Sequence, residues 1–286
     1  MYVRKVIGVF VLFVSLMIIS GCGTTDKNST TTNIDDSKWK DVEESGKLVV
    51  GTSGTLYPAS YYPEGSDRIT GYNVEVIREV AKRLGLESKF EIMSFDSKMA
   101  ALQSGRVDVV MAGPRDESKE KFNFSEPFKY SYSTMIVRSE DHSGIESLED
   151  LKGKVAGGAA TTVYSDIARK YGAEVKTYGN ATNDVYLRDV ANGRTDVIIN
   201  DYYLQSLALK AFPELDIELH PDLKFHPQTV SVVTPKEDQI LADKIDETVK
   251  EMKNDGTLTK LSGEFFGGQD VSQEIKDDIK EIEGIE

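Results

Sequence analysis

The fold is decided by one stretch of the sequence, Gly193-Arg194-Thr195-Asp196-Val197-Ile198-Ile199-Asn200-Asp201-Tyr202-Tyr203. It has the pattern of a turn, a short buried strand and a loop that opens with a carboxylate. In a parallel sheet, ligands bind outside the carboxyl ends of the strands, where loops and helix N-termini converge. Asp201 is therefore placed where a charged side chain can meet a ligand.

The same pattern occurs earlier in the chain, in Gly105-Arg106-Val107-Asp108-Val109-Val110-Met111-Ala112-Gly113. A second pair of segments also matches, because residues 46–55 and 153–162 each have a Gly-Lys turn, a strand and a Gly/Thr loop. Such turns are common in α/β proteins, so each match alone is weak. Both matches in the same order favour two α/β lobes of like design, with the site between them.

The N-terminal residues 1–21 have the pattern of an export signal. Two basic residues precede an apolar run at 6–19, which is short for a membrane span. The run ends in Ile19-Ser20-Gly21-Cys22, which resembles the lipobox of bacterial lipoproteins, in which the cysteine is acylated and becomes the new N-terminus. The alternative is a plain secretory signal with an incidental cysteine. Cys22 is the only cysteine of the chain, which excludes an internal disulfide and agrees with lipid attachment.

The charge of the mature chain is strongly negative. Removal of the signal takes away two of the 34 basic residues and none of the 48 acidic ones, which leaves a net charge of −16. This sign argues against nucleic acid and anionic membrane surfaces as partners. It does not limit a small ligand, whose field is set locally.

The length of 286 residues accommodates two lobes, a tether and a tail. Chain crossings between the lobes are expected near Arg138 and at 230–235, and two such crossings form a hinge that permits closure around a ligand. The predicted divisions are a signal peptide at 1–21, a flexible tether at 22–38, lobe 1 at 39–138 plus 234–268, lobe 2 at 139–233, and a loose acidic tail at 269–286.

Local patterns predict several elements that bear on the site. Residues 73–84 form the clearest helix, with apolar residues on one face and Gly85 in the C-cap position. Thr161 and Thr162 begin a further predicted helix, whose free N–H groups favour an anion. Residues 131–137 alternate like a strand, and 220–229 are predicted to be irregular.

Seven motifs carry a resemblance to a known family. They are Gly51-Thr-Ser-Gly-Thr, Gly71-Tyr-Asn-Val-Glu-Val, Leu102-Gln-Ser-Gly-Arg-Val-Asp, Phe124-Ser-Glu-Pro-Phe, Ser147-Leu-Glu-Asp-Leu-Lys-Gly-Lys, Gly193-Arg-Thr-Asp and Asp255-Gly-Thr-Leu. In this order they resemble family 3 of the bacterial extracellular solute-binding proteins, the polar amino-acid receptors of ABC importers. The resemblance covers residues 48–266 and implies the periplasmic-binding-protein type II fold, an α/β fold with two lobes, a two-stranded hinge and a ligand cleft between the lobes. Residues 160–205 look closest to members that bind cystine or related sulfur-containing amino acids.

The resemblance also implies roles for individual residues. Asp201 matches the aspartate that pairs with the ligand α-ammonium, through a charge-assisted hydrogen bond. Thr161 and Thr162 match the pair that receives the α-carboxylate, and Phe95 stands where an aromatic ring covers the ligand. The complete predicted site comprises Tyr57, Phe95, Gly113, Arg115, Ser118, Thr161, Thr162, Asn200 and Asp201.

Lobe 1 departs from the family pattern at the carboxylate-binding arginine. Family members have a Thr-x-x-Arg run six residues before the Phe-Ser pair, and Ser118 stands at the arginine position here. We expect Arg115 to take the role from a shorter loop. Otherwise carboxylate recognition falls to Thr161, Thr162 and backbone N–H groups, and the ligand is not an ordinary α-amino acid. Leu56 similarly shifts the register of the aromatic expected at Tyr57.

The leading hypothesis is a monomeric receptor, held by lipid on the outer face of the cell membrane, that delivers an amino acid to an ABC permease and ATPase without a cofactor. An enzyme on the same fold, such as a dehydratase, would need a general acid or base in the cleft. His142 lies in a linker, and His220 and His226 in an irregular stretch, so none is well placed. A sensory module that presents ligand to a membrane receptor is a third possibility. The sequence predicts no metal-ligand cluster and no nucleophile triad.

Overall fold

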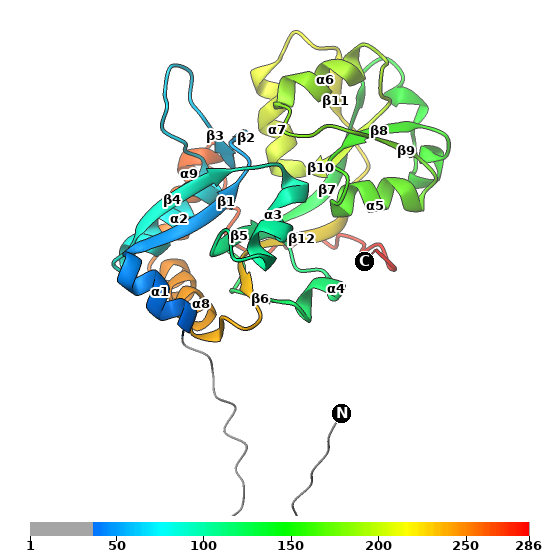
Figure 1. Cartoon of the computed structure of the whole chain (residues 1–286). Coiled ribbons are helices and arrows are strands. Elements are labelled where there is room, and N and C mark those ends of the chain that lie inside the picture. Colours follow the sequence, from blue (N-terminus) through cyan, green and yellow to red (C-terminus); the bar gives the residue numbers. More distant parts are fainter. Residues whose placement is uncertain (1–36, 286) are drawn as a thin grey trace, which may run out of the picture. The chain divides into compact units, whose positions relative to one another are not determined.

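The computed structural model describes residues 37–285 (Figure 1). The predicted signal peptide, Cys22 and all but the end of the tether lie outside the described residues. Within residues 37–285, no helix is long and apolar enough to cross a membrane.

The described part of the chain alternates between helices and strands. The α-helices are α1 (Ser37–Ser45), α2 (Tyr72–Arg83), α3 (Phe95–Gln103), α4 (Asp116–Lys119), α5 (Val163–Lys170), α6 (Asn183–Ala191), α7 (Tyr202–Ala211), α8 (Gln239–Asn254) and α9 (Thr257–Phe265). Two 3₁₀ helices are η1 (His142–Gly144) and η2 (Leu148–Leu151). The strands are β1 (Lys47–Thr52), β2 (Thr55–Leu56), β3 (Ser60–Tyr61), β4 (Glu87–Ile92), β5 (Val109–Ala112), β6 (Phe122–Phe124), β7 (Lys129–Arg138), β8 (Val155–Gly158), β9 (Glu174–Thr177), β10 (Ile198–Asp201), β11 (Ile217–Leu219) and β12 (Phe225–Pro235).

One sheet connects the two halves of the chain. Its strand order is β10-β7-β12-β5-β1-β4, with β6 paired to β12 and β11 paired to β7. Strands β4, β1 and β5 run parallel, whereas β12 is antiparallel to β5, β6 and β7. The parallel pair β8-β9 joins the second half through a bridge between Ala156 and Val197.

The two repeats found in the sequence make the same contacts. Asp108 accepts a hydrogen bond from the Val49 N–H at 2.8 Å and donates its own N–H to the Val49 carbonyl at 2.8 Å. Asp196 does the same with Val155, at 2.9 Å and 2.7 Å. In both lobes, the aspartate of the Gly-Arg-x-Asp segment thus fixes the strand that follows the Gly-Lys turn.

Separate apolar clusters form the interior of each lobe. Helix α2 packs on β4 and helix α8 on β12, and fully buried residues such as Ile77 and Val249 join both helices in one apolar cluster, which confirms the apolar face predicted for 73–84. In the second lobe, Ile167 of α5 packs with Met135 of β7 and with Val197. Each fully buried side chain of this size contributes about 1.5–3 kcal/mol to stability.

The hinge strands differ from the predicted ones. Strand β12 pairs with β7 up to Val230 and with β5 and β6 from Ser231 onward, and it begins at Phe225 within a stretch predicted to be irregular. Among the described strands, β7 pairs with β12, β10 and β11 and with no other. We therefore infer that the first crossing lies ahead of Lys129 instead of near Arg138. All of β7 except its last residue is buried, which explains why its alternation was a poor guide to its ends.

The prediction of a loose tail at 269–286 is wrong for the residues up to 285. Val271 is 1% exposed, and its carbonyl accepts a hydrogen bond from the Tyr130 N–H at 2.8 Å. Farther along, Ile282 joins the apolar cluster of the second lobe, and the His226 N–H donates to the Lys280 carbonyl at 2.8 Å. Spaced apolar residues among the acidic ones hold this segment against both lobes.

Candidate functional site

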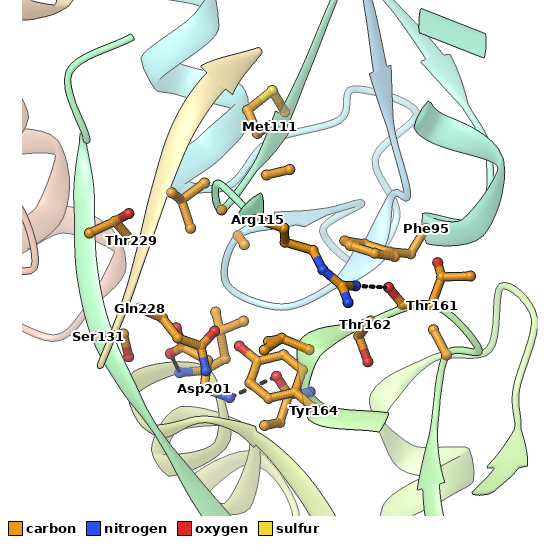
Figure 2. Close-up of a pocket in the computed structure, with 18 of the residues that line it drawn as sticks. Phe95, Met111, Arg115, Ser131, Thr161, Thr162, Tyr164, Asp201, Gln228 and Thr229 are labelled. Carbon is orange, nitrogen blue, oxygen red and sulfur yellow. Dashed lines mark hydrogen bonds between the residues drawn. The ribbon is translucent and has the colours of Figure 1, made fainter. Parts of the chain in front are cut away.

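A cavity of about 1120 Å³ lies between loops of the two lobes (Figure 2). Eight of the nine predicted site residues line it: Phe95, Gly113, Arg115, Ser118, Thr161, Thr162, Asn200 and Asp201. Tyr57 does not belong to its lining, because its ring packs edge-on against Tyr61, with the ring centroids 4.9 Å apart. Leu56 lines the cavity instead. The one-residue shift of the loop relative to the family pattern therefore keeps Tyr57 out of the cavity.

Asp201 ends β10 and begins α7, where both of its carboxylate oxygens are engaged. Oδ1 accepts the Leu204 N–H at 3.0 Å and so caps α7. Oδ2 accepts a hydrogen bond from Lys129 Nζ, at the start of β7. The two side chains are 2% and 4% exposed, so this is a fully buried ion pair in the wall of the cavity. Lys129 was not among the predicted site residues, although a lysine within a run of apolar strand residues is unusual.

The turn before α5 holds a carboxylate, as predicted for an anion-binding helix start, but the carboxylate belongs to the protein. Asp96 of α3 accepts hydrogen bonds from the Thr161 N–H at 2.9 Å, from Thr161 Oγ1 at 2.6 Å and from the Ala160 N–H at 3.2 Å. Thr162 Oγ1 accepts the Ser165 N–H at 3.2 Å and caps the helix. Lobe 1 therefore supplies an anion to the donors that the family resemblance assigns to a ligand.

Arg115 also reaches across to α5. Its Nη2 donates to Asp166 Oδ2 at 2.6 Å and its Nη1 to the Thr161 carbonyl at 2.9 Å, while Nε is buried without a hydrogen-bond partner. Ser118 fixes the loop locally, because its Oγ accepts the Arg115 N–H at 2.9 Å. The guanidinium is at the cavity, as expected, but two of its donors already bind the second lobe. Figure 2 shows the bond to Thr161.

Lys98 is a second cation of the cavity lining that was not among the predicted site residues. It is 8% exposed, donates from Nζ to the Met111 carbonyl at 3.0 Å, and stands over the Phe95 ring at 4.4 Å from the centroid. Burial lowers the pKa of its ammonium group to about 8. Among residues 37–285, no carboxylate lies within ion-pair distance of Lys98. The structure places it with Ala101 and Leu102 on the buried face of α3.

The remaining predicted residues shape the cavity. Phe95 lies beside Arg115 (Figure 2), and Asn200 Oδ1 accepts the Asp201 N–H at 2.7 Å. A side chain at Gly113 would bring its Cβ to 2.7 Å from the Thr229 carbonyl oxygen, so glycine is needed where β5 ends against β12. Tyr164 adds a partly buried ring to the lining, and desolvation raises the pKa of its hydroxyl well above the ordinary value.

The histidines are arranged differently from the sequence-based expectation. His142, Glu146 and His220 bring potential metal-ligand atoms within 4.8 Å of one another, although no such cluster was predicted. His220 is already satisfied, because Nε2 bonds the Ile145 carbonyl at 2.9 Å and Nδ1 accepts two backbone N–H groups. This group therefore has a structural role. His226 was not expected in the cleft, but it lines the cavity. The pKa of its imidazole is lowered, and burial is the main cause.

The chain is similar in sequence and structure to known proteins. The family model of the bacterial extracellular solute-binding proteins, family 3, matches residues 48–268. The probable ABC transporter extracellular-binding protein YckB of Bacillus subtilis is 51% identical, over 99% of this chain and 98% of its own length. The L-cystine-binding protein TcyA of the same organism is 33% identical, over 94% and 100%. The crystal structure of YckB covers 86% of this chain and 99% of its own, with a TM-score of 0.69 at 54% identity. The predicted type II fold, with two lobes and a two-stranded hinge, is confirmed.

Proposed function

Because the chain belongs to the bacterial extracellular solute-binding proteins of family 3, we propose that it is the receptor of an ABC importer and closes its lobes over a polar amino acid or a derivative of one. The observation that carries this proposal is the cavity between the lobes, where Arg115, Asp201 and the start of α5 bring charged and polar groups together. Closure removes water from these groups and strengthens their electrostatic contacts with a ligand.

Cystine and related sulfur-containing amino acids are the first ligands to test. TcyA, named as an L-cystine-binding protein, is similar to this chain, and the similarity covers 94% of the residues of this chain. A cavity of about 1120 Å³ also has room for a ligand of cystine's size.

For the cellular context we propose a lipid anchor at Cys22, a position on the outer face of the cell membrane, a monomeric state, and a permease and an ATPase as partners. The support is the sequence pattern at 1–22 and the membership of the family. The chain should incorporate a labelled fatty acid and sediment with membranes. Cys22→Ser should remove both properties, and label retained in that variant would contradict the anchor.

We also propose that the chain binds its ligand without converting it. Lys98 and His226 are titratable groups in the cavity lining, but Lys98 holds the Met111 carbonyl and His226 Nδ1 accepts the Ile282 N–H at 3.4 Å. Mass spectrometry of the bound ligand after long incubation should find it unchanged. A dehydrated product would favour the enzyme alternative.

The test of the receptor proposal is the melting temperature of residues 23–286, which lack the signal peptide and Cys22, with single amino acids, cystine, cysteine derivatives and dipeptides. A ligand at 100 times its dissociation constant adds about 2.7 kcal/mol to the free energy of unfolding. Phe95→Ala should remove the shift, because the ring lines the cavity. Val185→Ala, at an exposed position of α6, is the matched control and should keep it. An unchanged melting temperature with every compound would contradict the proposal.

A further inference from the structure

The buried Lys129–Asp201 pair restricts what can bind at Asp201. A ligand ammonium group needs a carboxylate whose charge is not already compensated. Here one oxygen receives Lys129 and the other caps α7. An arriving ammonium would lie beside Lys129 Nζ, and like charges in a dry site repel strongly. The family resemblance assigns Asp201 to the α-ammonium group of a ligand. In this chain the ammonium group of Lys129 occupies that position.

The anion-binding turn before α5 is occupied in the same way. Asp96 takes the Thr161 N–H, the Thr161 hydroxyl and the Ala160 N–H, and Asp166 takes Arg115. A ligand carboxylate therefore finds these donors already engaged.

Lys98 instead offers a cationic site without a carboxylate partner among residues 37–285. Its ammonium group is buried in the cavity wall with one carbonyl acceptor and one aromatic ring, and no carboxylate of residues 37–285 neutralises it. A buried charge is costly unless it is paired, so a ligand carboxylate at this point completes the site. Figure 2 shows Met111, whose carbonyl holds Lys98, across the pocket from Asp201.

We propose that the cleft selects a carboxylate ligand whose α-nitrogen carries no charge, namely an N-acyl amino acid, with Lys98 binding its carboxylate and Lys129 excluding a free ammonium group. The proposal rests on the receptor function above and specifies its ligand class. The acyl amide is polar but neutral, and the neutral amides Asn200 and Gln228 line the same cavity.

The experiment is calorimetric titration of residues 23–286, which lack the signal peptide and Cys22, with matched sets of ligands. Each set contains an L-amino acid, its N-acetyl derivative and the 2-hydroxy acid with the same side chain, and cystine is included. We expect the best ligand to be an N-acetyl derivative, bound at least about tenfold more tightly than its free amino acid. Lys98→Met should weaken its binding by about tenfold or more, because the carboxylate loses the cation that binds it.

Lys129→Met should reverse the preference. The neutral side chain of similar length frees the charge of Asp201, so the free amino acid should gain about tenfold and the N-acetyl derivative should gain nothing. The double variant Lys129→Met/Asp201→Asn removes both charges and should lose that gain. The comparison within the wild-type chain needs no variant, so it decides the question even where Lys129→Met does not fold.

The outcomes separate the two proposals. Tighter binding of a free amino acid than of its N-acetyl derivative by the wild-type chain would overturn the ligand class and leave the receptor function standing. Tightest binding of the 2-hydroxy acid by the wild-type chain would also overturn the ligand class. It would show that a ligand needs only to lack the ammonium charge and that the acyl group adds nothing. Absence of binding by every set would overturn the receptor function itself.

Discussion

Lys129 Nζ donates to a carboxylate oxygen of Asp201 in a pair whose side chains are 2% and 4% exposed. A buried pair of this kind costs desolvation for both charges, and loss of one partner leaves the other uncompensated. We therefore regard the pair as a fixed part of the cleft, which sets the charge that a ligand meets.

Replacing one partner of this pair should destabilise the chain strongly. Lys129→Met is expected to lower the free energy of unfolding by about 3–5 kcal/mol, because Asp201 stays buried without its cation. Urea denaturation of the ligand-free chain measures this. The double variant Lys129→Met/Asp201→Asn should recover a large part of the loss, and equal stability of the single and double variants would contradict the coupling.

The contact of Asp96 with the turn before α5 connects the lobes. Asp96→Asn keeps the shape but removes the charge that holds Thr161 and Ala160, so the unfolding free energy should fall by about 1 kcal/mol. The ligand-free chain should also become more open, seen as a larger radius of gyration in X-ray scattering. Asp116→Asn, on the exposed first turn of α4, is the control. An unchanged radius in Asp96→Asn would show that this contact does not hold the lobes together.

The buried Lys98 should make stability depend on alkaline pH. Its pKa is about 8 in the folded chain, whereas an ordinary lysine, as in the unfolded chain, has a pKa of 10.5. Between these two pH values the unfolded chain binds more protons than the folded chain, so the free energy of unfolding rises with pH. Lys98 packs on the Phe95 ring and the Met111 carbonyl. Lys98→Met should add roughly 1–3 kcal/mol at pH 7 and remove this part of the pH dependence. Parallel stability curves for the variant and the wild type from pH 7 to 10.5 would be evidence against a desolvated ammonium.

Asp189 should make the second lobe sensitive to acid. Hydrogen bonds from Lys176 and Tyr178, and one from Arg194, lower the pKa of its carboxyl to about 2. A lowered carboxyl pKa contributes stability above pH 3.8, and this contribution disappears as the pH falls toward 2. Asp189→Asn should lower the free energy of unfolding by roughly 2 kcal/mol at pH 7. The free energy of unfolding of this variant should also depend less on pH below pH 3.8. Asp222→Asn, at an exposed position, should leave both unchanged.

Several features were predictable because local sequence specifies them. The Gly-Arg-x-Asp and Gly-Lys repeats fix two strands by the same contacts, Asp108 with Val49 and Asp196 with Val155. The helix start at Thr162 and the loop position of Asp201 also follow from short patterns. These features placed the cavity between the lobes correctly.

The charges that set the cleft were not predictable, because their partners are distant in sequence. Lys129 and Asp201 are 72 positions apart, and Asp96 and Thr161 are 65 apart. Local periodicity shows that a lysine lies on a strand but not which carboxylate it meets. The tail was misjudged for a related reason, since its acidic composition concealed apolar residues such as Ile282 that pack on a distant lobe.

The most direct measurement of the central claim is calorimetric titration of the mature chain with amino acids and their N-acetyl derivatives, after bound ligand has been removed by unfolding and refolding. The account predicts that one of these compounds binds at a single site with a dissociation constant near 1 µM or lower, about −8 kcal/mol, and that Phe95→Ala loses the binding. Heats indistinguishable from dilution for every compound, with a chain that melts cooperatively, would contradict the assignment of this cleft to an amino-acid receptor.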